Sequence, residues 1–106
     1  LDYLLGRPTW EVQGLGPVLT GYNPDVEVEE DTENLCASMY CLEGWRTTVG
    51  NYLLFDSEAD ASFAQKILGG DSFTNGRLLL DRNGVEIDAD MKRLSIELLY
   101  PQTGWG

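Results

Sequence analysis

The chain has 106 residues, with 18 acidic and 7 basic side chains and a formal net charge of −11 at pH 7. This length suits one domain with one hydrophobic core, and no apolar run approaches the roughly 18 residues of a membrane span. The charge argues against direct binding to nucleic acids or anionic membranes, because their phosphate groups repel it. A basic protein is the partner that such a field attracts, whereas solubility alone is the competing explanation of the acidity.

The chain contains two cysteines, Cys36 and Cys41, and no histidine. Two cysteines are too few for a disulfide-dense secreted framework. We therefore expect reduced core thiols and favour a cytoplasmic location, with a disulfide across a tight loop as the alternative. Because the sequence starts at Leu1 and not at methionine, we expect a trimmed or processed chain in which a targeting segment would not be visible.

Two short strands are expected near the N-terminus. Residues 9–13 alternate in polarity and precede a turn rich in glycine, and residues 18–22 precede the turn signal Asn23-Pro24. Residues 1–5 fit either one helical turn or a strand.

The segment from Asp25 to Glu33 is the most acidic part of the chain, with six acids and no base. Val26 and Val28 alternate with acids, so its first half fits an edge strand with a charged face, and its second half fits a solvated loop or the start of a helix. Residues 1–45 hold nine acids and one base, whereas residues 46–106 hold nine acids and six bases. We therefore expect partner binding at these acids and the aromatic residue beside them: Asp25, Glu27, Glu29, Glu30, Asp31, Glu33 and Tyr22.

Residues 34–42 are ambiguous between a strand and a short helix, because short apolar runs cannot be separated by period alone, and we favour a strand. Residues 45–55 are rich in β-branched and aromatic side chains. They predict one long strand with a bulge or bend at Gly50.

A helix is predicted over residues 57–68. Asp56 or Ser57 can cap it, Ser57 and Asp60 have capping-box spacing, and Gly69-Gly70 ends it. An apolar stripe of Ala59, Phe63 and Ile67, with Ala64 and Leu68 beside it, is expected to pack on a sheet.

The C-terminal part is expected to form a three-stranded antiparallel meander. Its apolar segments are residues 78–80, 85–89 and 94–100, and Asn83-Gly84 supplies the turn between the first two. Beyond Pro101 the tail is expected to place Trp105 against the body. The predicted fold is therefore a single α+β domain spanning residues 1–106, with a mostly antiparallel sheet and one amphipathic helix on one face.

Motifs for catalysis or cofactor binding are not recognisable. Without histidine, a Ser-His-Asp triad, a Cys-His pair and the usual zinc ligands are excluded. Gly14-Leu15-Gly16-Pro17 lacks the rest of a phosphate-binding loop, and Asp81–Asp90 has its glycine at the wrong position for a calcium loop. We expect no catalytic residues, no cofactor and no metal ligands.

The leading functional hypothesis is a small non-enzymatic binding protein, of the inhibitor or immunity type, whose acidic surface engages a basic partner such as a nucleic-acid-binding enzyme. The alternative is a structural or assembly subunit, or a domain of a larger virion or complex component. A minor enzyme or a carbohydrate binder is a third possibility.

Overall fold

The structure is a computed structural model of the chain, and it describes residues 26–99. The strands expected at residues 9–13 and 18–22, and the expected placement of Trp105, lie outside these residues.

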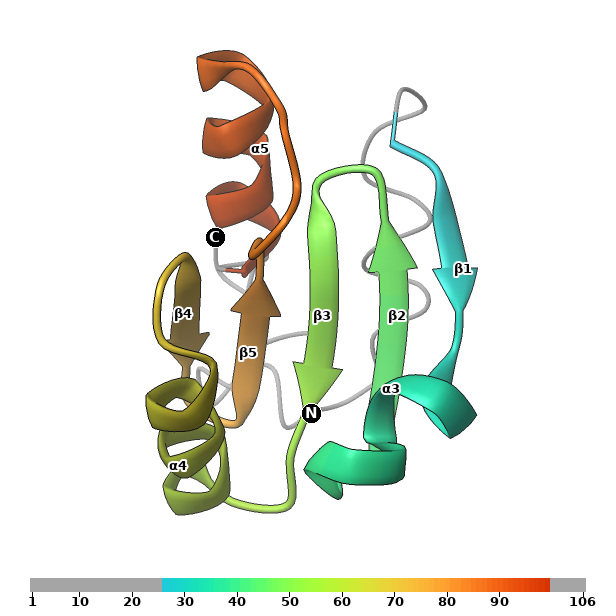
Figure 1. Cartoon of the computed structure of the whole chain (residues 1–106), viewed down its shortest axis with the longest axis vertical. Helices are drawn as coiled ribbons and strands as arrows, with labels where there is room; N and C mark the ends of the chain where they lie inside the picture. The colour runs from blue at the N-terminus through green and yellow to red at the C-terminus, as the bar shows by residue number, and fades with distance from the viewer. Residues whose placement is uncertain (1–25, 100–106) are drawn as a thin grey trace, which may run out of the picture.

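Residues 26–99 form a five-stranded antiparallel sheet with helices on both faces, which confirms the α+β class. The strand order is β1-β2-β3-β5-β4, so β1 and β4 are its edges within the described part of the chain (Figure 1). The expectation of one amphipathic helix is not confirmed, because this part of the chain holds three. The strands are β1 (Val28–Glu30), β2 (Glu43–Thr47), β3 (Gly50–Leu54), β4 (Ser72–Asn75) and β5 (Leu78–Asp81), and the helices are α3 (Thr32–Met39), α4 (Glu58–Leu68) and α5 (Ala89–Leu99).

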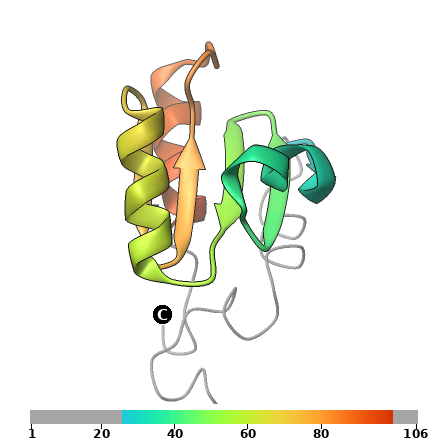
Figure 2. The ribbon, with the colours of Figure 1, turned by 60° about the horizontal axis from the view of Figure 1, so that its bottom comes forward.

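The sheet buries apolar side chains on both faces, because successive residues of a strand point to opposite sides. Helix α5 covers one face, where Leu94, Leu98 and Leu99 pack with Tyr52, Leu54, Leu78 and Leu80. Helix α4 and the end of α3 cover the other face, where Ala61, Ala64, Leu35 and Met39 pack with Leu53, Phe55 and Leu79. Figure 2 shows α4 and α5 on opposite sides of β5.

Helix α4 confirms the predicted helix and its cap. The Ser57 hydroxyl accepts a hydrogen bond from the Asp60 amide at 3.1 Å, and Gly69 ends the helix with a φ of 54°. The predicted buried stripe is confirmed for Ala64 and Leu68, which pack with the core on this face of the sheet. It is wrong for Ala59, Phe63 and Ile67, because Ala61 faces the sheet in their place. Phe63 and Ile67 are 66% and 63% exposed.

The predicted C-terminal meander is also wrong after its first strand. Leu78–Asp81 is a strand, but its antiparallel partner on the outer side is β4, and Ala89–Leu99 is helix α5. The apolar residues of this segment satisfy a strand period, but Met91, Leu94 and Leu98 also satisfy a helical one. Asp88 favours the helix, since its carboxylate accepts a hydrogen bond from the Met91 amide at 2.9 Å.

The single strand predicted over residues 45–55 is a hairpin instead. Thr47 pairs with Gly50 across a two-residue turn, and Gly50 has a φ of 137° that side-chain-bearing residues rarely adopt. The Thr47 hydroxyl donates to the Gly50 carbonyl at 2.7 Å and accepts from the Val49 amide at 3.1 Å. Gly50 therefore begins the returning strand β3 and makes no bulge.

The strand favoured over residues 34–42 is helix α3, and the expected reduced thiols form a disulfide between Cys36 and Cys41. Helix α3 ends at Tyr40, whose left-handed conformation (φ 57°, ψ 38°) turns the chain back on itself. The two Cα atoms are thus 4.7 Å apart. In a strand, five residues would separate them by about 16 Å, which a disulfide cannot span.

Candidate functional site

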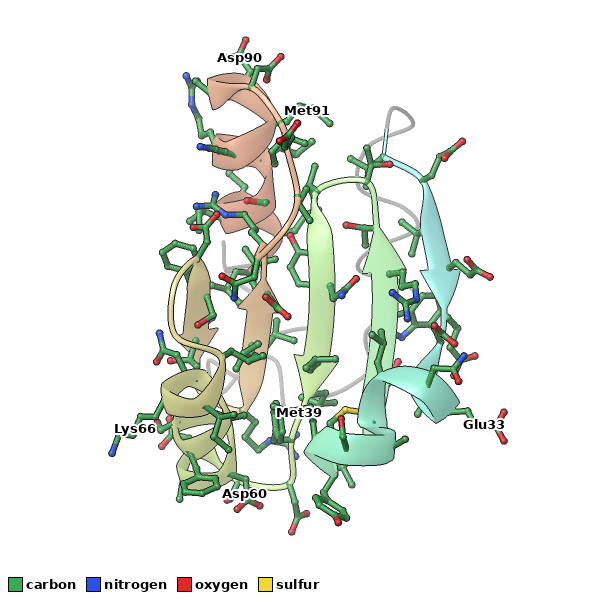
Figure 3. All side chains as sticks on the ribbon, viewed as in Figure 1. Glu33, Met39, Asp60, Lys66, Asp90 and Met91 are labelled. Atoms are coloured by element: carbon green, nitrogen blue, oxygen red, sulfur yellow. A yellow bond between two sulfur atoms is a disulfide. The ribbon has the colours of Figure 1, made fainter. Side chains whose placement is uncertain are left out.

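The acidic surface, defined here as Glu27, Glu29, Glu30, Asp31 and Glu33, follows the outer edge of β1 and the first turn of α3. Within residues 26–99, β1 pairs with β2 alone, with Val28 opposite Thr47 and Glu30 opposite Trp45. Val28 packs against the core on the α5 side, so Glu29 points to the opposite face. The carboxylates therefore wrap around the edge of the sheet, and Figure 3 shows Glu33 pointing outward from it.

Four of these carboxylates are exposed, namely Glu27, Glu29, Glu30 and Glu33. Asp31 differs, because its carboxylate forms an ion pair with Arg46 and accepts a hydrogen bond from the side-chain amide of Asn34 at 2.8 Å. The hydrogen bond from Arg46 holds the pKa of the Asp31 carboxyl below its ordinary value of 3.8. Asp31 therefore has a structural role as well as a negative charge.

The start of α3 is attached to β2 by further hydrogen bonds. The Asp31 amide donates to the Gly44 carbonyl at 2.9 Å, and the Gly44 amide donates to the Thr32 hydroxyl at 3.1 Å. The Thr32 hydroxyl in turn lies 3.1 Å from a carboxylate oxygen of Glu30, to which it can donate. These bonds hold the acidic surface in one geometry, and the positive end of the α3 dipole stabilises Glu33 in its first turn.

Two open hollows lie along the acidic surface. One, of about 500 Å³, is lined by residues 30–33. The other, of about 460 Å³, is lined by Glu27, Glu29 and Arg46, together with Val28, Thr47 and Thr48. Arg46 also lines the second hollow, so its positive charge partly offsets the negative charge of Glu27 and Glu29 there.

The structure brings five of the seven predicted site residues together. Asp25 and Tyr22 lie outside the described residues. Residues 26–99 contain no group of three histidine, cysteine, aspartate or glutamate side chains arranged to hold a metal ion.

An apolar groove that was not predicted from the sequence lies between the C-terminal end of α3 and α4, and Tyr40, Phe63 and Ile67 are exposed in it. A signal for it was present in α4, where Ala61 and Ala64 offer a second apolar stripe at helical spacing. Burial of that stripe turns the larger side chains outward.

Comparisons of the chain with protein-family models, curated proteins and solved structures find no match. Among the described residues, no helix has the length and apolar character needed to cross a membrane.

Proposed function

We propose that this protein is a small non-enzymatic binding domain that engages a basic protein partner through its acidic surface. The observation that carries the proposal is the row of exposed carboxylates at one edge of the fold. Within residues 26–99, Asp31 is the only member of the acidic surface with an ion-pair partner. The charges of Glu27, Glu29, Glu30 and Glu33 are therefore left to act on another molecule.

The physical basis of binding is the summed field of these charges. A single exposed ion pair contributes little, about 0–1 kcal/mol, but several like charges on one surface steer a basic partner and raise its association rate. Salt weakens this attraction, because the screening length is about 8 Å at physiological ionic strength. Binding should therefore be strongest at low salt.

A nucleic-acid-binding enzyme is the partner class that we favour, and inhibition is the role that follows from it. The groove of such an enzyme is lined with lysine and arginine to receive phosphates. Carboxylates held on a hydrogen-bonded edge can occupy the same positions and exclude the nucleic acid. This supports an inhibitor or immunity-type role.

The test compares two triple variants of equal charge. Glu27→Gln/Glu29→Gln/Glu33→Gln neutralises the acidic surface and keeps Glu30, which is within hydrogen-bond distance of Thr32. Asp56→Asn/Glu86→Gln/Asp90→Asn removes three exposed acids elsewhere. A partner is captured on the unmodified protein at about 50 mM salt, near the low end of the screening range, and its affinity for all three proteins is then measured.

We expect the first variant to bind at least about tenfold more weakly and the second within about twofold of the unmodified protein. Equal weakening by both variants would mean that only net charge matters, and the acidic surface would lose its special role.

The alternative of a structural or assembly subunit is favoured by one observation, the exposure of Tyr40, Leu42, Phe63 and Ile67. It predicts self-association, which light scattering over a range of protein concentrations measures. A mass that stays that of one chain would argue against it.

A further inference from the structure

A second surface, an apolar groove of about 260 Å³, lies where the C-terminal end of α3 faces α4. Figure 3 shows Met39 at the end of α3 on the side of α4, with Asp60 at the lower end of α4 and Glu33 at the far end of α3. The groove is therefore distinct from the acidic surface. Its lining residues are Ser38, Met39, Tyr40, Asp60, Phe63, Ala64 and Ile67.

The walls of the groove expose large apolar side chains. Tyr40, Phe63 and Ile67 are 87%, 66% and 63% exposed. A single exposed hydrophobic residue is ordinary, but three that line the same groove form a surface of the kind found at protein interfaces. Tyrosine is also among the residues that contribute most to binding in such interfaces.

The groove is preformed by the fold. Tyr40 is held at the end of α3 by the hydrogen bond from its amide to the Cys36 carbonyl, 2.9 Å long, and by the neighbouring disulfide. Phe63 and Ile67 are one helical turn apart on α4, and burial of Ala61 and Ala64 against the sheet turns them outward. A partner therefore finds the apolar side chains already in place, which lowers the entropy cost of binding.

The charge around the groove is negative at one end. Asp60 lines it, and Asp56 and Glu58 are exposed at the same end of α4. Lys66 points away from α3 (Figure 3). This distribution complements a ligand that carries lysine or arginine beside its apolar side chains.

A second copy of the chain fits these features less well than a basic partner does. Two copies would bring together surfaces with the same acidic rim, and each copy has a net charge of −11. A groove of 260 Å³ also accepts only a few side chains. A stable dimer buries on the order of 800 Å² on each partner.

We propose that this groove binds a basic amphipathic helix of a protein partner. Because helices flank the groove and its walls are side chains, it offers no strand edge to pair with an extended peptide. Insertion of the apolar face of a helix is the mode that remains. The apolar anchors would pack on Tyr40, Phe63 and Ile67, and flanking lysines or arginines would face Asp60 and Glu58. This inference goes beyond the proposed function and holds whether or not the acidic surface binds anything.

The test uses the full chain, labelled with ¹⁵N, and a synthetic helical peptide with leucines at positions i, i+3, i+4 and i+7 and lysines beside them. A scrambled peptide of the same composition is the control for charge. At about 150 mM salt, where distant charges are screened, we expect the first peptide to shift the amide signals of residues 38–40 and 60–67. The scrambled peptide should bind at least about tenfold more weakly, because it cannot present one apolar face.

Two variants assign the binding to the groove. Phe63→Ser/Ile67→Ser should weaken binding of the first peptide at least about tenfold. Both side chains are exposed, so this variant should fold, and its thermal unfolding is recorded to confirm it. Glu27→Gln/Glu29→Gln/Glu33→Gln should leave the affinity within about twofold, because that surface lies at the other end of α3.

Other results would overturn the proposal. They are the absence of peptide binding, equal binding of the scrambled peptide, and signal changes confined to residues 27–33. Groove signals that move on dilution of the protein alone would identify a second copy as the occupant. Nuclear Overhauser contacts from residues 1–25 or 100–106 to Phe63 in the free protein would show that a segment of the same chain occupies the groove.

Discussion

Arg82 is the residue that ties the hairpin of β4 and β5 to helix α5. Its guanidinium binds both carboxylate oxygens of Asp71, at 2.6 and 3.1 Å, and donates to the Ser95 hydroxyl at 3.1 Å and the Lys92 carbonyl at 3.2 Å. It also lies 4.7 Å from the centre of the Phe73 ring. A buried charge is expensive unless it is paired and hydrogen-bonded, and Arg82 meets both conditions.

Replacement of this residue should therefore destabilise the fold. We expect Arg82→Met to lower the free energy of unfolding by about 2–4 kcal/mol, because the Asp71 carboxylate and the Ser95 hydroxyl lose the hydrogen bonds that the guanidinium donates. Urea unfolding measures the change. Arg93→Met is the matched control. Among the residues that the structure describes, Arg93 makes only an exposed pair with Asp90 at 3.5 Å, and its loss should change stability by less than about 0.5 kcal/mol. Similar effects of the two substitutions would contradict the role given to Arg82.

The ion pair between Asp31 and Arg46 predicts a pH dependence. Because the pKa of Asp31 is lowered in the folded protein, its stabilising contribution is fully present above the ordinary value of 3.8 and is lost as the pH falls through the folded value. Arg46→Met should raise the pKa of the Asp31 carboxyl toward that ordinary value. A carboxyl titration followed by NMR measures it, and an unchanged midpoint would show that Arg46 is not the cause.

Helix α3 illustrates how a short element depends on its attachments. It has no fully buried residue, and its hydrogen bonds to β2 hold one end while the Cys36–Cys41 disulfide holds the other. A helix of 8 residues is marginal by itself in water, so these attachments keep it formed.

Removal of the disulfide should loosen the end of α3 that lines the groove. For so short a loop, the chain-entropy estimate of the stabilisation is about 2 kcal/mol. We expect Cys36→Ser/Cys41→Ser to lower the free energy of unfolding in urea by that amount. The amide hydrogens of residues 38–42 should exchange with solvent faster, and those of α4 should exchange at an unchanged rate. If the amides of α4 exchange as fast as those of α3, or if stability is unchanged, the disulfide does not hold this end of α3.

The net negative charge and its uneven distribution are properties of the whole molecule. A net charge of −11 on 106 residues creates self-repulsion in the folded state, and the acidic surface concentrates part of it at one edge. Salt screens this repulsion.

Stability should therefore rise with ionic strength. We expect the free energy of unfolding to increase by about 1 kcal/mol between about 20 and 300 mM sodium chloride, because the screening length shortens over this range. The Glu27→Gln/Glu29→Gln/Glu33→Gln variant should show a smaller increase, since it has less repulsion to screen. Thermal unfolding at each salt concentration measures both, and equal slopes would show that the acidic surface is not a centre of repulsion.

Some features of this protein depend only on local sequence. Ser57 caps α4 because a hydroxyl three residues before Asp60 can accept its amide hydrogen bond wherever the helix lies. The acidic run forms the expected strand at an edge of the sheet within residues 26–99, since Val28 alternates with charged residues that a central strand could not accommodate. Of the two alternatives for its second half, a solvated loop or the start of a helix, the structure has the helix. These features could be predicted because the interacting groups are neighbours in the chain.

The tertiary structure decided the rest. Leu94 and Leu98 fit both a strand and a helix, and the space over Tyr52 and Leu80 selects the helix. In α4, either apolar stripe could face the sheet, and close packing selects Ala61 and Ala64, which leaves Phe63 and Ile67 to form the groove. The disulfide likewise depends on the turn at Tyr40, which brings two cysteines together that a strand would separate. In each case the sequence permits two local structures of similar energy, and contacts with distant residues choose between them.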